Sequence, residues 1–335
     1  MTWLDPHPFL RGVAWLDRGR PVRADPADAG RLPWDAWERA TLPIGVRLEF
    51  TAEDAAAVEI RYRASPPGES DALRELPHCF ALWQDGRCVS ETITEPAAES
   101  VVTLALPGSS AAPFTVHPPE SVAPEILGLR AVGGSIAPAP RQPRWLVHGD
   151  SITEGWWSTR PAHSWPATAG RRLGLDTVNL GYAGCAHGEP ALAQQLASLD
   201  ADAITLAFGT NCWSSTPCSA PLMYETVRTF LTLVRQGHPR TPLLVVSPVL
   251  RPGAENTPNR LGATLADLRT AMERAVTDRR EGSDGQDADD WLALLPGRHL
   301  LRAGQLADGV HPDDEGHAVL AAAVAEALPS ARPNG

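Results

Sequence analysis

From residue 145 onward the chain alternates short apolar runs with helical stretches, and this rhythm constrains the fold more than any other feature. Residues 203–208 and 243–246 are continuous apolar runs, as expected of parallel strands that are buried on both faces. Between them, residues 221–235 place apolar side chains on one helical face: Met223, Val227, Phe230, Leu231 and Val234. Strands that alternate with helices predict a parallel sheet covered on both sides, which is a three-layer α/β/α sandwich.

The same pattern predicts the other elements of this half of the chain. Strands are expected at residues 145–147, 177–180, 203–208, 243–246 and 298–301. Helices are expected at residues 191–199, 221–235, 261–276 and 313–328. The acidic stretch 284–290 is expected to be a solvated surface loop.

Residues 1–138 have a different pattern, which is typical of an all-β domain. Residues 45–50 and 57–63 alternate apolar and polar side chains, as half-buried strands do. Short, regularly spaced strands separated by turn residues predict an antiparallel, jelly-roll-like sandwich. Its further strands are expected at residues 79–83, 87–93, 101–106, 114–117 and 126–132, with a hairpin turn at Asp85-Gly86. Trp34 and Trp37 fit no strand, and we expect them to plug one end of this sandwich.

A Gly/Pro-rich segment, residues 133–144, separates the two patterns and is predicted to be a linker. The length of 335 residues is suitable for two domains. We therefore expect an N-terminal β-sandwich accessory domain at residues 1–138 and a catalytic α/β domain at residues 139–335.

Charge and composition argue against several classes of protein. The 29 basic and 40 acidic residues give a net charge of −11, which disfavours nucleic acids and anionic membrane surfaces as partners. All basic residues are arginine, so lysine-based covalent catalysis is excluded. The five cysteines are odd in number and form no CxxC pair, so neither a disulfide framework nor a zinc site is expected. The absence of a signal-like or membrane-spanning stretch favours a cytoplasmic protein.

Polar motifs follow the predicted strands, and they contain the residue types that acyl transfer requires. Ser151 lies in Gly149-Asp150-Ser151, Gly184 closes residues 179–184, Asn211 follows the third strand, and Asp308 and His311 precede the last helix. The carboxyl ends of parallel strands converge on one edge, so these residues can meet there. Ser151 would be the nucleophile, His311 its base and Asp308 the acceptor that orients His311. The N–H groups of Ser151 and Gly184 and the amide of Asn211 would stabilise an oxyanion.

Each motif alone has an ordinary structural interpretation. Gly149-Asp150-Ser151 can be a capped strand-to-helix turn, and an Asp near a His is usually a surface cap. The order of the motifs, each at the end of a strand, favours the catalytic interpretation.

As a set, these blocks resemble the SGNH/GDSL hydrolase superfamily, in which four blocks supply Ser, Gly, Asn and His. The resemblance spans about residues 145–328, and it implies a flavodoxin-like fold, a serine esterase or acyltransferase, and no cofactor or metal. It assigns Ser151, Asp308 and His311 to the triad, and Gly184 and Asn211 to the oxyanion hole. The third block departs from the family because Cys212 follows Asn211 where Asp is common, which places the detail of that loop in doubt.

The N-terminal sandwich is also similar to domains that precede the catalytic domain in several branches of the superfamily. These branches include carbohydrate acetyl esterases and an actinobacterial group that contains natural-product acyltransferases. The second group is the more similar one, on the pattern of residues 42–63, 114–119 and 126–130.

Four further residues are candidates for contact with the substrate. Trp156, Trp157 and His187 flank the predicted nucleophile and oxyanion blocks, where they can rim the acyl pocket. One of the tryptophans can equally pack between the domains. Arg251, which follows the fourth strand, can meet an anionic substrate or face water.

Cys185 adjoins Gly184 and can lie close to Cys212. The pair has two interpretations: two buried thiols, or a redox switch.

Three functions are compatible with these observations. The first is a hydrolase of small-molecule carboxylic esters, such as a deacetylase. The second is an acyltransferase in which an alcohol of a small metabolite or natural product captures the same acyl-enzyme. The third is a non-catalytic carbohydrate-binding protein built on the sandwich.

Overall fold

The computed structural model describes residues 2–64, 78–95, 98–108, 112–214, 216–283, 285 and 287–331. Its C-terminal part contains a five-stranded parallel sheet in the order β13-β12-β14-β15-β16. The strands are β12 (Arg144–Gly149), β13 (Asp176–Gly181), β14 (Ala203–Ala207), β15 (Leu243–Val246) and β16 (Leu292–Leu295). This is the strand order of flavodoxin-like folds, as the resemblance implies.

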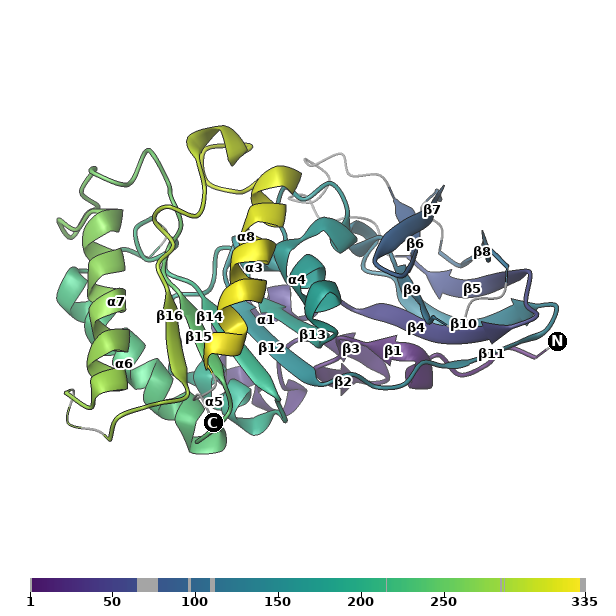
Figure 1. Ribbon diagram of the computed structural model, residues 1–335, viewed down its shortest axis with the longest axis horizontal. Coiled ribbons are helices and arrows are strands. Elements are labelled where there is room, and N and C mark those ends of the chain that lie inside the picture. The colour runs from purple at the N-terminus through teal and green to yellow at the C-terminus, as the bar shows by residue number, and fades with distance from the viewer. Residues whose placement is uncertain are drawn as a thin grey trace.

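Helices cover both faces of the sheet because successive strand residues point in opposite directions (Figure 1). Leu146 and Val178 pack in the core of one face, and Trp145 and Val147 pack in the core of the other. The first face is covered by α5 (Pro190–Ser198), α6 (Ala220–Gly237) and α7 (Leu265–Glu281). The second is covered by α4 (Trp165–Leu173) and α8 (Asp314–Ala327). The predicted three-layer architecture is confirmed.

Two predicted elements of this half are placed incorrectly. The fifth strand is β16, and residues 298–301 form a turn rather than a strand. The apolar side chains that pair with β15 lie earlier, with Leu292 opposite Leu243. The predicted helix at 261–276 starts instead at Leu265, because Thr264 and Asp267 form a capping box that begins α7 there.

The acidic stretch 284–290 is not wholly solvated as predicted. Asp289 is buried and forms an ion pair with Arg235 on α6, with an N–O distance of 2.7 Å. Residues 284 and 286 lie outside the described residues.

The N-terminal part contains the predicted antiparallel sandwich. One sheet has the order β1-β4-β9-β6-β7, with β11 paired to β4, and the other has the order β10-β5-β8. The rings of Tyr62 and Phe80 meet between the two sheets, with centroids 4.8 Å apart. Asp85 and Gly86 both have positive φ and form the predicted hairpin turn. The strands are β1 (Leu10–Arg11), β4 (Arg47–Glu53), β5 (Ala57–Arg63), β6 (Cys79–Gln84), β7 (Arg87–Ile93), β8 (Ser100–Ala105), β9 (Phe114–His117), β10 (Glu125–Val132) and β11 (Ser135–Pro138).

The segment 133–144 is not simply a linker, because it includes strand β11. Gly134 allows the turn into this strand, since a Cβ there would lie 2.0 Å from the carbonyl oxygen of Glu53. Ile136 then packs into the core of the sandwich. Strand β11 thus pairs with β4 before the chain enters the parallel sheet.

Residues 15–40 pack on the parallel sheet and its helices, and do not plug the sandwich as predicted. This segment contains β2 (Trp15–Asp17), β3 (Arg20–Val22) and helix α1 (Trp34–Ala40). Ala36 and Ala40 of α1 are fully buried in the core shared with α5 and α6, and Trp37 packs against that core. Trp34 is 77% exposed. Two alanine side chains and the Trp37 indole therefore dock α1, whereas Trp34 faces solvent.

Short 3₁₀ helices connect these elements: η1 (His7–Phe9), η2 (Pro26–Arg31), η3 (Glu120–Val122), η4 (Pro161–His163), η5 (Ala303–Gln305) and η6 (Leu328–Ala331).

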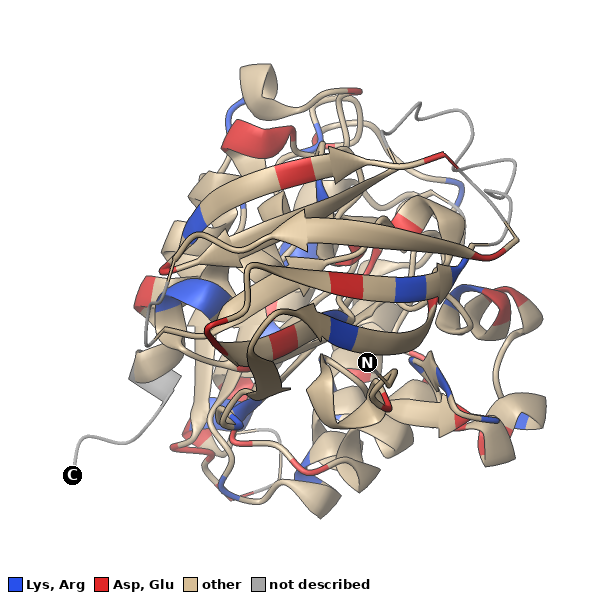
Figure 2. Ribbon diagram, turned by 90° about the vertical axis from the view of Figure 1, so that its right-hand side faces the viewer, with Lys and Arg blue, Asp and Glu red and all other residues tan. Residues whose placement is uncertain are grey.

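The outer surface of the sandwich carries charges of both signs. Both basic and acidic residues occur on its strands, as Figure 2 shows. Arg61 on β5 donates to Glu99 at 2.7 Å, and Arg130 on β10 pairs with Glu59. Within the part of the chain that the structure describes, no helix has the length and apolar character needed to cross a membrane.

Candidate active site

A sharp turn after β12 presents Ser151 at the end of the parallel sheet. Gly149 makes the turn possible, because a Cβ there would lie 2.1 Å from Thr153 Oγ1 and 2.2 Å from the carbonyl oxygen of Ala207. Asp150 then caps helix α3 (Ser151–Glu154) by accepting the N–H of Ile152 at 3.0 Å. Ser151 is only 5% exposed, and its hydroxyl faces His311 in the loop before α8.

A chain of hydrogen bonds joins Ser151 to two residues near the start of α8. Ser151 Oγ lies 2.8 Å from His311 Nε2, and His311 Nδ1 lies 2.7 Å from Asp308 Oδ2. Asp308 Oδ1 also accepts the backbone N–H groups of His311 and Val310. Burial raises the pKa of Asp308, but the hydrogen bonds from His311 and Val310 outweigh it and hold the pKa below its usual value. Asp308 therefore stays ionised and can accept a hydrogen bond from the imidazole.

The register of the sheet brings the other two predicted residues to the same edge. Gly149 pairs with Gly181 on β13 and with Ala207 on β14, so these three strands end level with one another. Gly184 follows three residues after Gly181, with a φ of +78° and open space where a Cβ would lie. Asn211 follows four residues after Ala207 and is buried.

Asp150 connects the nucleophile turn to the loop that carries Asn211. Its buried carboxylate accepts the backbone N–H groups of Ile152 and Thr210. Burial raises the pKa of Asp150 to about 6, although these hydrogen bonds oppose the rise. Gly209 shapes the same loop, with a φ of +124° and Pro248 Cγ only 2.8 Å from where a Cβ would lie.

Glu154 is an organising residue of the site that the sequence did not identify. This buried carboxylate at the end of α3 accepts the N–H of Ala183 at 2.9 Å, next to Gly184, and the indole N–H of Trp156 at 3.1 Å. Arg23 lies 3.5 Å from it, and Arg39 of α1 also pairs with it. Its place in the first sequence block was a signal, but nothing in the sequence predicts that arginines more than a hundred residues earlier reach it.

The two tryptophans after α3 lie in different environments. The Trp156 ring lies beside the His311 ring, with centroids 5.6 Å apart, and the Arg39 guanidinium lies 5.8 Å from the indole centroid. Trp157 is 41% exposed and has a φ of +67°, which is uncommon for a bulky residue. Trp156 thus adjoins the Ser151–His311 pair, and Trp157 presents its indole toward solvent.

Two strands of the sandwich contact the loop that follows these tryptophans. Arg160 makes two hydrogen bonds to the carboxylate of Glu91 on β7, at 2.8 and 2.9 Å. The ring of Trp83 on β6 meets that of His163 edge-on, with centroids 6.1 Å apart. The N-terminal half of the chain therefore contacts the loop leaving the nucleophile helix.

His187 and Arg251 flank the site. His187 Nδ1 lies 2.9 Å from Glu189, which also accepts the backbone N–H of His187. Arg251 donates to the carbonyl oxygen of Thr210, next to Asn211, at 3.3 Å. Burial lowers the pKa of Arg251, while the charges of Asp308 and Asp150 oppose the change, so its guanidinium is within electrostatic reach of both carboxylates.

The cysteines are all free thiols. Cys185 donates to the carbonyl oxygen of Ala183 at 3.2 Å, and Cys212 donates to that of His187 at 3.6 Å. Burial raises the pKa of Cys185 to about 12 and strongly raises the pKa of Cys212. The thiol that adds to the rise at Cys212 is Cys218, not Cys185. These contacts favour two separate buried thiols over a redox switch.

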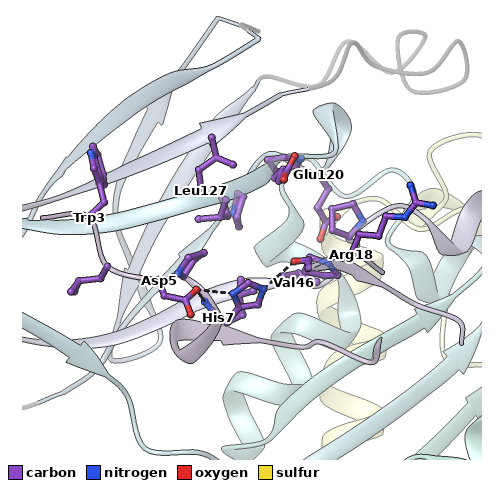
Figure 3. Close-up of a pocket in the computed structure, with 17 residues that line it drawn as sticks. Trp3, Asp5, His7, Arg18, Val46, Glu120 and Leu127 are labelled. Atoms are coloured by element: carbon purple, nitrogen blue, oxygen red, sulfur yellow. Dashed lines mark hydrogen bonds and ion pairs between the residues drawn. The ribbon is translucent and has the colours of Figure 1, made fainter. Parts of the chain in front are cut away.

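A separate cavity of about 400 Å³ lies on the sandwich, near the N-terminus (Figure 3). Its walls include Trp3, Arg18 and Glu120. The imidazole of His7 in this cavity is already bonded on both sides, to Asp5 at 2.7 Å and to the carbonyl oxygen of Gly19 at 3.1 Å. The cavity contains none of the residues gathered at the sheet edge. Over the described residues, no group of three or more His, Cys, Asp or Glu side chains is placed to hold a metal ion.

Comparison with known proteins identifies the family. The model of the GDSL-like lipase/acylhydrolase family matches residues 147–319, more than half of the chain. No curated protein sequence matches the chain.

Solved structures show the same two-part fold at low sequence identity. The salicylyl-acyltransferase SsfX3 from a tetracycline biosynthetic pathway is 23% identical, with a TM-score of 0.82 over 96% of this chain and 94% of its own. A family two carbohydrate esterase from Clostridium thermocellum, in complex with cellohexaose, is 15% identical, with a TM-score of 0.61 over 84% of this chain and 90% of its own. An acetyl xylan esterase from the rumen bacterium Butyrivibrio proteoclasticus is 15% identical, with a TM-score of 0.56 over 84% of this chain and 88% of its own.

Proposed function

Because the chain belongs to the GDSL-like lipase/acylhydrolase family, and is therefore an ester hydrolase or acyltransferase of the SGNH type, we propose that it cleaves a carboxylic ester through an acyl-enzyme on Ser151. The observation that carries the proposal is the hydrogen-bonded chain from Ser151 through His311 to Asp308. A serine hydroxyl is a weak nucleophile unless a base removes its proton, and a neutral imidazole at 2.8 Å can do so.

The reaction has two halves. Ser151 Oγ attacks the ester carbonyl while its proton moves to His311 Nε2, which gives a tetrahedral intermediate and an imidazolium held by Asp308. The intermediate then expels the alcohol, which takes the proton from His311, and the acyl group remains on Ser151. A water molecule then attacks the acyl-enzyme while His311 takes its proton. As this second intermediate collapses, His311 returns the proton to Ser151 Oγ, which releases the carboxylic acid and the free enzyme.

The negative charge of the intermediate requires donors that are already in place. We assign this role to the backbone N–H groups of Ser151 and Gly184 and to the side-chain amide of Asn211. The assignment is supported by the level strand ends that carry these residues and by the open space beside Gly184.

The substrate is a small-molecule ester. Trp156 offers indole surface beside the Ser151–His311 pair, and Trp157 presents a solvent-exposed indole next to it in the chain, so the two suit a flat or aromatic group. Arg251, beside the Asn211 loop, suits a polar or anionic substituent. His187, whose Nδ1 is engaged by Glu189, is assigned to the wall of the pocket.

Acyl transfer to an alcohol is the second candidate. The same acyl-enzyme serves both reactions, and the outcome depends on whether water or an acceptor alcohol reaches it. The full-length likeness to a salicylyl-acyltransferase supports keeping this candidate, because both halves of the two chains superimpose.

The test combines a variant with a product analysis. Ser151→Ala should abolish release of p-nitrophenol from p-nitrophenyl acetate, while Ser158→Ala, a nearby buried serine, should retain it. Esterase activity that survives Ser151→Ala would contradict the proposal; if carbohydrate binding alone persisted, the protein would be a binding module.

Incubating the wild-type enzyme with the ester and a candidate acceptor alcohol separates the two reactions. Free acid as the main product indicates hydrolysis, and an acylated acceptor indicates transfer.

A further inference from the structure

A second cavity, of about 220 Å³, lies between the sandwich and the parallel sheet. Trp83 and His117 line it from β6 and β9, and Arg171 lines it from α4. Asn179 contributes from β13, the edge strand of the parallel sheet. The cavity contains neither Ser151 nor His311, so it is distinct from the site described above.

Two buried carboxylates in or near this cavity, Glu49 and Asp176, are already paired. Glu49 pairs with Arg47 at 2.7 Å and with Arg11 at 3.8 Å. Asp176 pairs with Arg47 at 2.9 Å and accepts the N–H of Gly12 at 2.9 Å. The two arginines Arg11 and Arg47 already balance these two carboxylates, so the region has no spare negative charge for a further cation.

Arg171 places an additional positive charge on the wall of this cavity. Its guanidinium lies 4.2 Å from the ring centroid of Trp83, and its Nη2 donates to the hydroxyl of Thr168 at 3.3 Å. No described carboxylate pairs with Arg171, and its Nη1 is buried without a hydrogen-bond partner. Burial, and then the charge of Arg47, lower the pKa of Arg171 to about 10, so the guanidinium is still charged near neutral pH.

Two more polar atoms of the cavity wall are buried without a hydrogen-bond partner, Trp83 Nε1 and His117 Nε2. A buried polar atom without a partner destabilises the folded protein relative to one that is hydrogen-bonded. Burial and the charges of Arg171, Arg47 and His163 hold the pKa of His117 well below its usual value, so its ring is neutral within cationic surroundings. Two acidic residues line the cavity: Glu49, which pairs with Arg47, and Asp85, which lies on an exposed turn.

We propose that this cavity binds one small organic carboxylate, whose anionic head faces Arg171 and the unsatisfied groups of Trp83 and His117. A single uncompensated guanidinium matches a monoanion. The rest of the wall favours an organic body over an inorganic ion, because it contains the apolar residues Pro113, Pro161, Pro166, Ala167 and Leu175. The carboxylate pairs with the guanidinium as Arg–carboxylate pairs do elsewhere, and small rotations of the three side chains bring their N–H groups to its oxygens. This inference does not depend on the proposed function.

The direct test follows the Trp83 indole N–H by ¹H–¹⁵N NMR in the full-length protein, with benzoate as the probe. Trp83→Phe identifies the resonance by its disappearance. Benzoate should shift the resonance saturably, whereas phosphate and chloride at the same ionic strength should leave it in place. A resonance that benzoate does not move, or that phosphate moves equally, would overturn the proposal of an organic carboxylate.

Matched variants on α4 locate the anion. Arg171→Met removes the guanidinium that lines the cavity, and Arg172→Met removes the exposed one beside it. Benzoate affinity should fall at least tenfold in Arg171→Met and stay unchanged in Arg172→Met. Equal affinities in the two variants would overturn the assignment of Arg171.

A measurement on wild-type protein keeps the proposal testable if Arg171→Met does not fold. Crystals soaked in 4-bromobenzoate should give an anomalous bromine peak between Trp83 and Arg171. A peak only at Ser151, or none at all, would show that the carboxylate does not bind this cavity.

Discussion

The buried carboxylate of Asp150 gives the protein a pH-dependent stability that one substitution should remove. Burial raises its pKa from 3.8 to about 6 in the folded protein. The folded state therefore binds a proton at this site more tightly than the unfolded state does. Its contribution to stability is complete below the unfolded pKa and is lost as the pH rises through the folded one.

The magnitude follows from the size of the shift. A displacement of about two pKa units corresponds to about 3 kcal/mol, of which about 2 kcal/mol falls between pH 4.5 and pH 7.5. Asp150→Asn keeps an oxygen that can accept the N–H groups of Ile152 and Thr210, but it cannot ionise. On going from pH 4.5 to 7.5, the wild type should lose about 2 kcal/mol more stability than the variant.

Urea unfolding at both pH values, followed by tryptophan fluorescence, measures this difference. Comparing the two proteins cancels every other titrating group, because only residue 150 differs. Equal pH dependence in the two proteins would refute the argument, since it would mean that Asp150 titrates alike in the folded and unfolded states.

Four other predictions concern the same edge of the sheet. Asn211→Ala should lower kcat by roughly 10²–10³ with a smaller change in KM, the usual effect of losing one oxyanion donor, and an unchanged kcat would reject that role. Gly209→Ala should lower the free energy of unfolding by about 1–3 kcal/mol in urea titrations, because its φ is +124° and Pro248 occupies the space of a Cβ. Glu154→Gln should cost about 3–5 kcal/mol in the same assay, because it leaves the buried charge of Arg23 uncompensated, and a smaller loss than in Gly209→Ala would contradict this. His311→Gln should abolish esterase activity, because Ser151 then loses its base, and activity retained in this variant would argue against that role.

The parallel sheet could be predicted because its strands carry their own signal. Residues 243–246 are apolar throughout and residues 203–207 are apolar except for Thr205, as is typical of strands buried on both faces. The prediction of the last strand at residues 298–301 is wrong because the true strand, Leu292–Leu295, is short and directly follows an acidic stretch, which masks its apolar pattern. The predicted start of α7 is wrong because Leu261 fits the helical spacing of apolar residues, whereas the capping box at Thr264 begins the helix at Leu265.

The contacts between the two halves of the chain could not be predicted. The motif residues Ser151 and His311 lie at ends of regular elements, so topology alone brings them together. Arg23, Arg39 and Arg171 lie at positions where arginine usually faces water, and their burial follows from how the halves pack. Periodicity reports which face of an element is apolar, but not which distant cation a buried carboxylate such as Glu154 will meet.

The central claim is that the acyl group of the substrate is carried by Ser151. Rapid quenching of the enzyme with p-nitrophenyl acetate, followed by proteolysis and mass spectrometry, tests it directly. One acetyl group should appear on the peptide that contains Ser151, and it should be absent from Ser151→Ala. Ester turnover with no adduct on that peptide, or an adduct on another residue that forms at the rate of turnover, would contradict the account.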